Sequence, residues 1–395
     1  MKVLIADKLS PKAVSALETM GLKVEVDASL EADTLPGRLG DAEVLVVRST
    51  KVTAAAIEAG ENLSLIIRAG AGVNTIDLKT ANRRGIHVAN CPGQNTAAVA
   101  ELALGHIIAA DRRIPDATAD LRAGAWKKKE YGKARGLKGR TLGILGMGSI
   151  GQALAVMARG MDMEVVGWSR SLTPEKAKKM GIGYCATPEA VAEASDVVSV
   201  HLAAAPETDH LVNAAFFNKM KDGAIFVNTS RGEVVDTAAL KEAITRKKLK
   251  VGLDVYEGEP AATANDFGDT GLAAMINASH HIGASTDQAS EAIADEVVRI
   301  IEEYRASGKP PNVVNTQAKS SGVTSLVVRH FNRVGVLAGV LDELRNASIN
   351  VEEMENSIFT GGEAAVCTLR LDDVPDKDLV KKLRTLENVI QVVLS

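Results

Sequence analysis

The sequence predicts an α/β protein with parallel, doubly wound sheets, followed by a small separate α+β unit. Runs of Val, Ile and Leu alternate with helix-like segments, and such unbroken apolar runs are typical of strands that are covered on both faces. A glycine-rich turn joins one of these runs to an Ala-rich helix. A stretch with Gly and paired Pro near residue 310 then precedes a segment with its own βαββαβ order.

The expected elements follow one another along the chain. The apolar runs expected to form strands before residue 315 are KVLIA, KVEV, EVLVVRS, LSLIIRAGAG, TLGILGMG, EVVGW, DVVSVHL, GAIFVNTS and LKVGLDV. A helix is expected at residues 11–20. After the polar, linker-like TQAKSSGVTS, the expected strands are SLVVRHF, INVEEMENS, EAAVCTLRL and VIQVVLS, and the expected helices are GVLAGVLDELRNA and KDLVKKLRTL.

Composition excludes several classes of protein. With 395 residues, 46% of them apolar and 24% charged, the chain is typical of a soluble globular protein of two or three domains. The net charge of −4 argues against a nucleic-acid partner, which needs a concentrated basic face. Three scattered cysteines offer neither a disulfide framework nor a metal site. No signal-peptide pattern or membrane-length apolar segment is visible, so we expect a cytoplasmic protein without a membrane partner.

The glycine-rich turn lies in GRTLGILGMGSIGQALAVMARGM, between a predicted strand and a predicted helix. Gly146, Gly148 and Gly151 have the spacing that permits a tight turn, close approach of a pyrophosphate and tight packing of helix on strand. The start of the helix, Ser149 and Ile150, would then face the phosphates. In this context the motif predicts a dinucleotide-binding domain with NAD or NADP as cofactor.

The end of the next predicted strand leaves the choice of cofactor open. An acidic residue about 20 positions after the glycines would hold the ribose hydroxyls of NAD, but EVVGW is followed by Ser169 and Arg170. An arginine here can accommodate the 2′-phosphate of NADP. Alternatively, Arg170 stacks on the adenine ring.

Three polar side chains follow predicted strands where a ligand cleft is expected. Arg231 comes directly after GAIFVNTS, Glu259 lies in VGLDVYEGEP, and His281 lies in SHHIGAST. Ligands bind beyond the carboxyl ends of parallel strands, so Arg231 can hold a substrate carboxylate and polarise a neighbouring carbonyl. A histidine beside a carboxylate is a standard proton-transfer pair, and the small residues after His281 favour it over His280. No Gly-x-Ser-x-Gly elbow supports a serine hydrolase instead.

Together these motifs resemble those of the D-isomer-specific 2-hydroxyacid dehydrogenases. GILGMGSIG, NTSRGEVVD, LDVYEGEP and HHIGAST stand in the family's order, and the resemblance covers residues 1 to about 315. It implies that His281 removes the hydroxyl proton while hydride leaves for the nicotinamide, that Glu259 supports the charged histidine, and that Arg231 binds the substrate carboxylate. Further cofactor contacts are expected from Thr229, Ser230, Asp254 and Gly283.

Within the family, VLVVRSTKVT, IIRAGAGVNTID and AWKKKEYGKARGLKGRTLGILG most resemble the branch that oxidises 3-phosphoglycerate, a doubly anionic substrate. The resemblance implies substrate contacts from Arg48, Ser49 and the backbone amides of Gly70, Ala71 and Gly72. Lys128 would contact the phosphate, unless the run of three lysines is only a solvated face.

The resemblance also implies a domain organisation. A substrate-binding domain would consist of residues 1–96 and 286–315, with a dinucleotide-binding domain of residues 97–285 inserted into it. A helix starting near Thr96 resembles the family's dimerising helix, which implies a homodimer or homotetramer; an ordinary buried helix is the alternative.

After a linker at 316–322, residues 323–395 resemble an ACT domain, a regulatory module that often binds amino acids between paired copies. In serine-sensing versions the ligand-holding positions correspond to His330, Asn332 and Asn350, whose imidazole and amides suit an amino acid's carboxylate and ammonium groups. A dimerisation module without a ligand is the alternative.

The sequence therefore predicts an NAD-linked dehydrogenase that acts on 3-phosphoglycerate, with L-serine as the effector of the C-terminal part. One alternative is an NADPH-preferring glyoxylate or hydroxypyruvate reductase, suggested by Ser169 and Arg170. Another is a non-catalytic, nucleotide-sensing regulator, against which the joint presence of Arg231, Glu259 and His281 argues.

Overall fold

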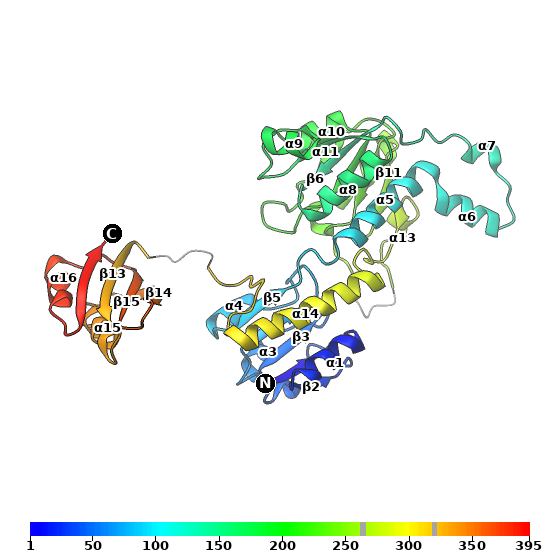
Figure 1. Ribbon diagram of the computed structural model, residues 1–395. Coiled ribbons are helices and arrows are strands. Elements are labelled where there is room, and N and C mark those ends of the chain that lie inside the picture. Colours follow the sequence, from blue (N-terminus) through cyan, green and yellow to red (C-terminus); the bar gives the residue numbers. More distant parts are fainter. Residues whose placement is uncertain (261–265, 318–321) are drawn as a thin grey trace. The chain divides into compact units, whose positions relative to one another are not determined.

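The computed structural model describes residues 1–260, 266–317 and 322–395 (Figure 1). The chain divides into two compact units, Met1–Asn315 and Thr316–Ser395. The first unit contains two parallel sheets with helices on both faces, which confirms the predicted α/β class. The second contains one four-stranded antiparallel sheet.

Residues near the N-terminus form a five-stranded parallel sheet in the order β2-β1-β3-β4-β5. Its strands are β1 (Lys2–Ile5), β2 (Lys23–Val26), β3 (Val44–Val47), β4 (Leu65–Arg68) and β5 (His87–Asn90). Helices α1 (Pro11–Thr19) and α14 (Asp287–Ser307) cover one face. The helices on the other face are α2 (Pro36–Leu39), α3 (Ala54–Ala59) and α4 (Leu78–Arg83). Because α14 follows the second sheet in the chain, a distant segment completes the core of this first sheet.

The second sheet has seven parallel strands in the order β12-β11-β10-β9-β6-β7-β8. They are β6 (Thr141–Leu145), β7 (Glu164–Trp168), β8 (Gly183–Tyr184), β9 (Val197–Val200), β10 (Ile225–Asn228), β11 (Lys250–Leu253) and β12 (Asn277–Ala278). The helices of one face include α5 (Thr96–Arg112), α8 (Ser149–Gly160) and α9 (Pro174–Met180). Those of the other include α10 (Pro188–Ala194), α11 (Ala214–Lys219) and α12 (Thr237–Lys247).

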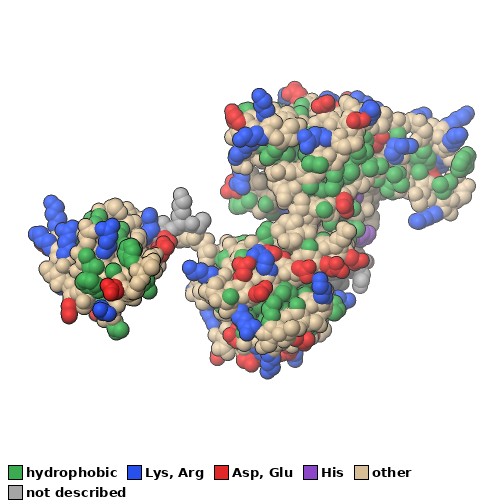
Figure 2. All heavy atoms as spheres, in the orientation of Figure 1, with side chains coloured by type: hydrophobic (Ala, Val, Ile, Leu, Met, Phe, Trp, Pro, Cys, Tyr) green, Lys and Arg blue, Asp and Glu red, His purple; other side chains and the backbone are tan. Residues whose placement is uncertain are grey.

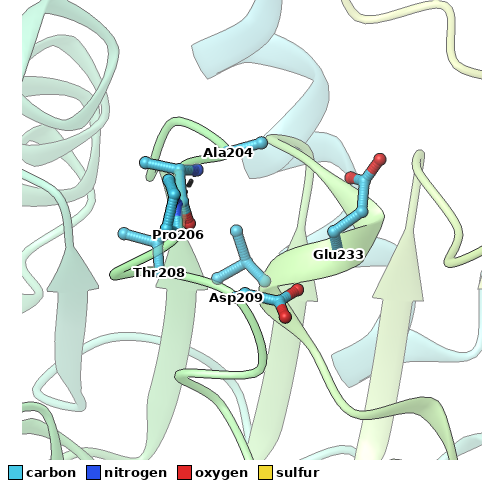
Figure 3. Close-up of a pocket in the computed structure, with 7 residues that line it drawn as sticks. Ala204, Pro206, Thr208, Asp209 and Glu233 are labelled. Atoms are coloured by element: carbon cyan, nitrogen blue, oxygen red, sulfur yellow. Dashed lines mark hydrogen bonds between the residues drawn. The ribbon is translucent and has the colours of Figure 1, made fainter.

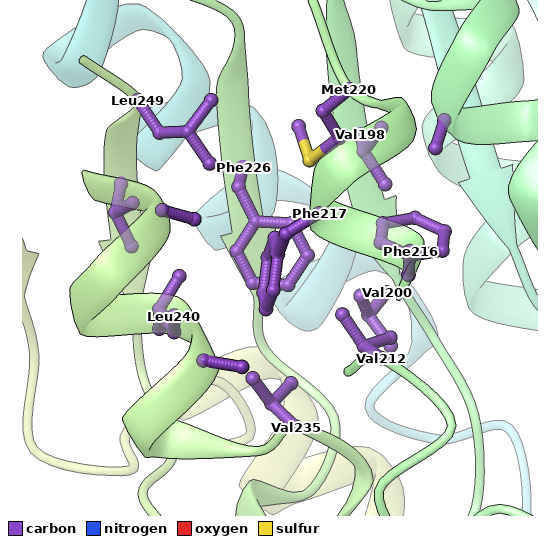
Figure 4. Close-up of a cluster of buried hydrophobic side chains, with 14 of the residues drawn as sticks. Val198, Val200, Val212, Phe216, Phe217, Met220, Phe226, Val235, Leu240 and Leu249 are labelled. Carbon is purple, nitrogen blue, oxygen red and sulfur yellow. The ribbon is translucent and has the colours of Figure 1, made fainter. Parts of the chain in front are cut away.

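Aromatic side chains form the centre of the core under α11 and α12 (Figure 4). Phe217 and Phe226 meet edge to face with their ring centroids 5.3 Å apart, and Phe216 packs against Phe217 in the same way. All three rings are buried, and each contributes about 1.5–3 kcal/mol relative to an exposed ring. This packing fixes β10, whose end carries Arg231.

The strand order of the seven-stranded sheet reverses at β6. The chain passes from β6 outward through β7 to β8, and then returns to β9 on the opposite side of β6. At such a reversal the loops that leave two neighbouring strands diverge, and a crevice forms beyond their carboxyl ends. The fold therefore places a ligand crevice beyond β6 and β9.

The second unit has the predicted βαββαβ order. Its elements are β13 (Thr324–Phe331), α15 (Val336–Asn346), β14 (Val351–Ile358), β15 (Ala364–Leu371), α16 (Lys377–Arg384) and β16 (Val389–Leu394). The sheet order is β14-β15-β13-β16, so β14 is an edge strand. Helices α15 and α16 pack on one face around Leu326, Val340 and Leu383.

Three short strands, β5, β8 and β12, were not predicted from the sequence. The apolar runs that were predicted as strands all lie on strands of the structure. The described residues contain no helix long and apolar enough to cross a membrane. They also bring no three His, Cys, Asp or Glu side chains together as a metal site. Cys91, Cys185 and Cys367 are free thiols, and all three are buried.

Candidate active site

The glycine-rich loop runs from the end of β6 into α8. Gly146 has a φ of +100°, and a Cβ there would lie 2.3 Å from the backbone oxygen of His201, so only glycine fits. A Cβ at Gly151 would lie 2.1 Å from the oxygen of Gly146, which shows how closely α8 packs on the turn. At Gly148, by contrast, a Cβ would meet nothing within 4 Å.

The first turn of α8 is therefore accessible to a ligand. Among the described residues no side chain caps this helix, so the amides of Ser149 and Ile150 have no capping partner there. Backbone amides at a helix N-terminus bind phosphate groups well. The loop thus fits the pyrophosphate of a dinucleotide.

Ser169 and Arg170 follow β7, the strand next to β6. Arg170 is exposed, and its Nη1 lies 3.9 Å from Oε2 of Glu207. Because both side chains are well exposed, at 73% and 66%, this pair is weak. Arg170 therefore remains available to a phosphate or an adenine ring.

A pocket of about 250 Å³ lies in the loop that follows β9 (Figure 3). Its walls are Ala204, Ala205, Pro206, Thr208, Asp209, Glu233 and Val234. The hydroxyl of Thr208 accepts from the amide of Ala205 at 2.9 Å and lies 2.7 Å from the oxygen of Ala203, which fixes the loop's shape. This pocket could not be predicted from the sequence because its small residues form no motif, although the loop follows a strand that borders β6.

The turn after β10 is organised by Asn228, another residue that the sequence analysis missed. Its Oδ1 accepts from the amide and the hydroxyl of Ser230, at 3.0 and 2.8 Å, and its Nδ2 donates to the oxygen of Arg231 at 2.9 Å. These bonds hold Arg231 at the end of the strand. The hydroxyl of Thr229 is buried without a partner among the described residues, so it can take a ligand contact.

Arg68, which ends β4, lies near Arg231, and Arg48 directly follows the neighbouring strand β3. A Cβ at Gly72 would lie 2.8 Å from Nη2 of Arg231, so Gly72 makes room for this guanidinium. Gly70 does the same for Arg68, whose Nη1 would lie only 1.8 Å from a Cβ there. Arg231 and Arg48 both repel Arg68 electrostatically, so each of the two lies near Arg68.

Among the described residues no carboxylate forms an ion pair with this arginine cluster, Arg48, Arg68 and Arg231, although Asp7 attracts Arg68 electrostatically. Nε of Arg68 is buried without a partner among those residues. Burial and the two neighbouring arginines lower the pKa of Arg68. Asp7 offsets part of the charge of the three guanidinium groups, and the remaining positive charge suits an anionic ligand.

Asp7, at the end of β1, positions the loop that carries Arg48. Its Oδ2 accepts from the amides of Arg48, Ser49 and Thr50, at 2.7, 3.2 and 3.1 Å. This carboxylate was not among the predicted site residues, although an acidic residue directly after an apolar strand could have indicated it. The side chain of Arg48 reaches toward α14, where its Nη1 lies 3.5 Å from Oγ of Ser290.

His281 and Glu259 form the predicted pair. Nδ1 of His281 lies 2.8 and 2.9 Å from the two carboxylate oxygens of Glu259. Because a carboxylate accepts, Nδ1 carries the proton and donates it, and Nε2 is left as the basic nitrogen. The imidazole is 44% exposed, so a substrate can reach it.

The loop around His281 is held by Asp254, which is 1% exposed. Oδ1 of Asp254 accepts from the amide of Ile282 at 2.9 Å, and Oδ2 accepts from the amide of Gly283 at 2.8 Å. The amide of His281 donates to the backbone oxygen of Asp254 at 2.8 Å. Asp254 and Gly283, predicted as cofactor contacts, thus bond to each other in this structure.

Lys128 lies elsewhere in the first unit. It begins α7 (Lys128–Tyr131), on an extension beyond the end of α5 (Figure 1). No hydrogen bond or ion pair among the described residues links it to the arginine cluster.

The three residues predicted to bind a regulatory ligand lie at two ends of one sheet. His330 and Asn332 lie at or just beyond the Phe331 end of β13. Asn350 directly precedes β14, whose first residue pairs with Leu371. Leu371 also pairs with Thr324, so Asn350 lies at the opposite end of the sheet. Along β13 these ends are about 20 Å apart, at roughly 3.3 Å per residue. A single copy of the unit therefore does not bring the three together.

Comparison with known proteins places this site among dehydrogenases. Residues 104–282 match the family model described as D-isomer specific 2-hydroxyacid dehydrogenase, NAD binding domain. The chain is 37% identical over 365 residues to a D-3-phosphoglycerate dehydrogenase of Methanocaldococcus jannaschii, which covers 91% of this chain and 68% of that protein. It is 39% identical over 305 residues to a hydroxypyruvate reductase of Thermotoga maritima, which covers 76% of this chain and 97% of that protein.

A solved dehydrogenase structure has a similar fold over most of the chain. The NAD⁺-bound 3-phosphoglycerate dehydrogenase of Entamoeba histolytica superposes with a TM-score of 0.66 and 27% identity, covering 80% of this chain and 99% of that one. The chain spans 59% to 68% of the length of the archaeal and mycobacterial D-3-phosphoglycerate dehydrogenases that it matches.

Proposed function

Because the chain belongs to the D-isomer-specific 2-hydroxyacid dehydrogenase family, we propose that it is an NAD-dependent D-3-phosphoglycerate dehydrogenase. The reaction is oxidation of 3-phospho-D-glycerate to 3-phosphohydroxypyruvate, the opening step of phosphorylated serine synthesis. Relatives that bear this name are 36–38% identical to the chain.

The observation that carries the substrate assignment is the arginine cluster. A simple 2-hydroxy acid has one carboxylate, and a single guanidinium such as that of Arg231 can bind it bidentately. Arg48 and Arg68 add two further cations that form no ion pair within the described chain, and Asp7 offsets only part of their charge. A substrate with a phosphate as well as a carboxylate would neutralise this excess charge.

In the proposed reaction, Arg231, His281 and Glu259 each have a distinct role at the reacting carbon. Arg231 holds the carboxylate and polarises the neighbouring C–O bond, while Nε2 of His281 accepts the hydroxyl proton as the ketone forms. Glu259 accepts from Nδ1 and stabilises the imidazolium that results. Bound NAD would accept the hydride, and the glycine-rich loop and the free hydroxyl of Thr229 are suited to hold it.

The pocket in the loop after β9 extends the proposed cofactor site. It follows a strand that borders the crevice beyond β6, and Arg170 lies near Glu207 of the same loop. This position suits the adenosine end of the cofactor. Ser169 and Arg170 bear on the choice between NAD and NADP, because the ribose of either would lie beside them.

A first experiment separates the main possibilities. Initial rates are measured with 3-phosphoglycerate and either NAD or NADP, with and without L-serine, and in reverse with glyoxylate and hydroxypyruvate. Turnover of 3-phosphoglycerate supports the proposal. Activity confined to glyoxylate or hydroxypyruvate would contradict the substrate assignment and leave the chemistry intact.

The second candidate function is that of a hydroxypyruvate reductase. It is favoured by the relative from Thermotoga maritima, of which the chain covers 97%, and by Ser169 and Arg170, which suit NADPH. A preference for NADPH with unphosphorylated substrates would decide for this candidate.

We also propose that the second unit is an ACT domain that binds L-serine between two copies. β14 is an edge strand, and an antiparallel pairing of two β14 strands would bring Asn350 of one copy to the end that carries His330 and Asn332 of the other. Asn350→Ala should then abolish serine binding measured by calorimetry on the full-length protein. Unchanged affinity would refute the placement of the ligand site, and binding of no serine by the unaltered protein would favour a purely dimerising module.

The extension beyond α5 suggests how two copies associate in the first unit. Helix α6 (Ile114–Arg122) buries no residue, and Ile114, Leu121 and Trp126 are 48%, 58% and 78% exposed. Hydrophobic side chains gather along this part of the surface (Figure 2). A short helix without a buried face gains little stability alone, so we propose that a second copy covers it. Trp126→Ala should weaken the dimer in analytical ultracentrifugation; an unaltered dimer constant would contradict this interface.

A further inference from the structure

A buried histidine on α5 connects to the loop that carries His281. His106 is 6% exposed, in a helix whose other buried residues are mainly apolar. A Cβ at Gly252, in β11, would lie 2.7 Å from Cβ of His106, so the missing side chain at 252 makes room for the imidazole. Burial of such a ring is costly unless it is hydrogen-bonded.

The partner of His106 is Ser279, in the segment between β12 and His281. Nε2 of His106 lies 2.9 Å from Oγ of Ser279, and this Oγ lies 2.6 Å from Oδ1 of Asp254. A serine hydroxyl has one proton, and the carboxylate can only accept, so Ser279 donates to Asp254. Nε2 of His106 must then carry a proton and donate to Ser279, which fixes the tautomer of the ring.

Asp254 stands at the end of this chain of donors. Its carboxylate holds the amides of Ile282 and Gly283, and its backbone oxygen holds the amide of His281. His281 itself has a φ of +53°, a conformation that a residue with a side chain adopts only where its surroundings impose it. The position of Asp254 therefore determines the backbone conformation at His281, and with it the position of the His281 imidazole.

We propose that His106 is a positioning residue for the reaction: through Ser279 it fixes Asp254 and so holds His281 against Glu259. This inference rests on the proposed role of His281 as proton acceptor. His106 does not touch the substrate, and the arginine cluster that would bind it comes from other segments. Loss of the His106 hydrogen bond is therefore expected to lower kcat and to leave KM nearly unchanged.

The test compares His106→Leu, which cannot donate, with His106→Gln, whose amide can donate from a similar position. Loss of a neutral hydrogen bond predicts a fall in kcat of about 3- to 10-fold for the leucine variant. The glutamine variant is expected to recover most of kcat. In a Ser279→Ala background, where no hydroxyl connects the two side chains, His106→Leu should have no further effect.

The matched control is Ser195→Ala, which removes another buried hydroxyl of the same unit, one that donates to the oxygen of Val191. Its kcat should be that of the unaltered enzyme. The proposal would be overturned if kcat were unchanged in His106→Leu, or if kcat fell equally in His106→Leu and His106→Gln. It would also be overturned if His106→Leu still lowered kcat by the full amount in the Ser279→Ala background.

Amide hydrogen exchange over residues 279–285 tests the same proposal without any turnover. We expect the exchange of the Ile282 and Gly283 amides to accelerate in His106→Leu and to be restored in His106→Gln. Unaltered exchange in the leucine variant would overturn the positioning role even if the enzyme is active. If the proposed function is wrong, the failure is different: the unaltered protein shows no turnover, while the exchange pattern still reports on His106.

Discussion

Replacing Arg68 by methionine should make the ligand-free protein more stable and the enzyme less effective. The buried Nε of Arg68 has no partner among the described residues, and its charge faces those of Arg48 and Arg231. An unsatisfied buried donor costs about 1–3 kcal/mol, and methionine keeps the apolar stem while removing the charge. For a unit of this size, that gain raises the melting temperature by roughly 2–10 °C.

The same substitution removes one charged contact to the proposed phosphate. Hydrogen bonds to charged groups contribute about 1.5–3 kcal/mol, so kcat/KM for 3-phosphoglycerate should fall by roughly 10- to 10²-fold. Thermal unfolding without substrate and initial-rate kinetics with saturating cofactor measure the two effects.

Arg84→Met is the matched control. The guanidinium of Arg84 donates to the backbone oxygens of Ile57, Glu58 and Gly60, at 3.2, 2.9 and 3.2 Å, so its loss should lower the melting temperature and leave kcat/KM unchanged. A lower melting temperature in Arg68→Met, or an unchanged kcat/KM, would refute the interpretation of Arg68 as a strained ligand-binding cation.

Three further predictions concern the catalytic pair, the nucleotide loop and His201, a partly buried histidine. His281→Ala should lower kcat by at least roughly 10²-fold and Glu259→Gln by about 10-fold or more; full activity in either would exclude a proton-transfer pair. Gly146→Ala, which forces a Cβ against a backbone oxygen at a φ of +100°, should lower the melting temperature and abolish NADH binding in a fluorescence titration, and normal binding would refute the close packing. Burial lowers the pKa of His201 from 6.5 to about 4. Between these two pH values the unfolded chain binds a proton at His201 and the folded chain does not, so lowering the pH from 6.5 to about 4 should lower the free energy of unfolding by about 3 kcal/mol. Chemical denaturation of His201→Gln should show a flatter pH dependence, and an equal slope would contradict this.

The fold could be predicted where one local pattern determines it. Long apolar runs such as those of β3 and β10 are buried on both faces, and the glycines between β6 and α8 are required by contacts within the turn itself. β5, β8 and β12 were missed because they are short and contain polar residues or glycine. Their pairing with longer neighbours, rather than their own sequence, makes them strands.

The site could be predicted only in part for a similar reason. His281, Glu259 and Arg231 stand in recognisable motifs, and the structure does bring His281 to Glu259. Arg68 was passed over because it ends β4, whereas Arg231 follows β10, and the two segments are far apart in sequence. The bond of His106 to Ser279 depends likewise on the packing of α5 against β11. Such contacts arise from tertiary structure, and spacing along the chain does not reveal them.

The proposed role of the arginine cluster is tested most directly by comparing 3-phospho-D-glycerate with D-glycerate as substrates for NAD reduction. If the arginine cluster binds the phosphate, kcat/KM should favour the phosphorylated substrate by at least roughly 10-fold, as loss of one charged contact alone would cost about 1.5–3 kcal/mol. Equal kcat/KM for the two substrates, or turnover of neither, would contradict the assignment of 3-phosphoglycerate as the substrate.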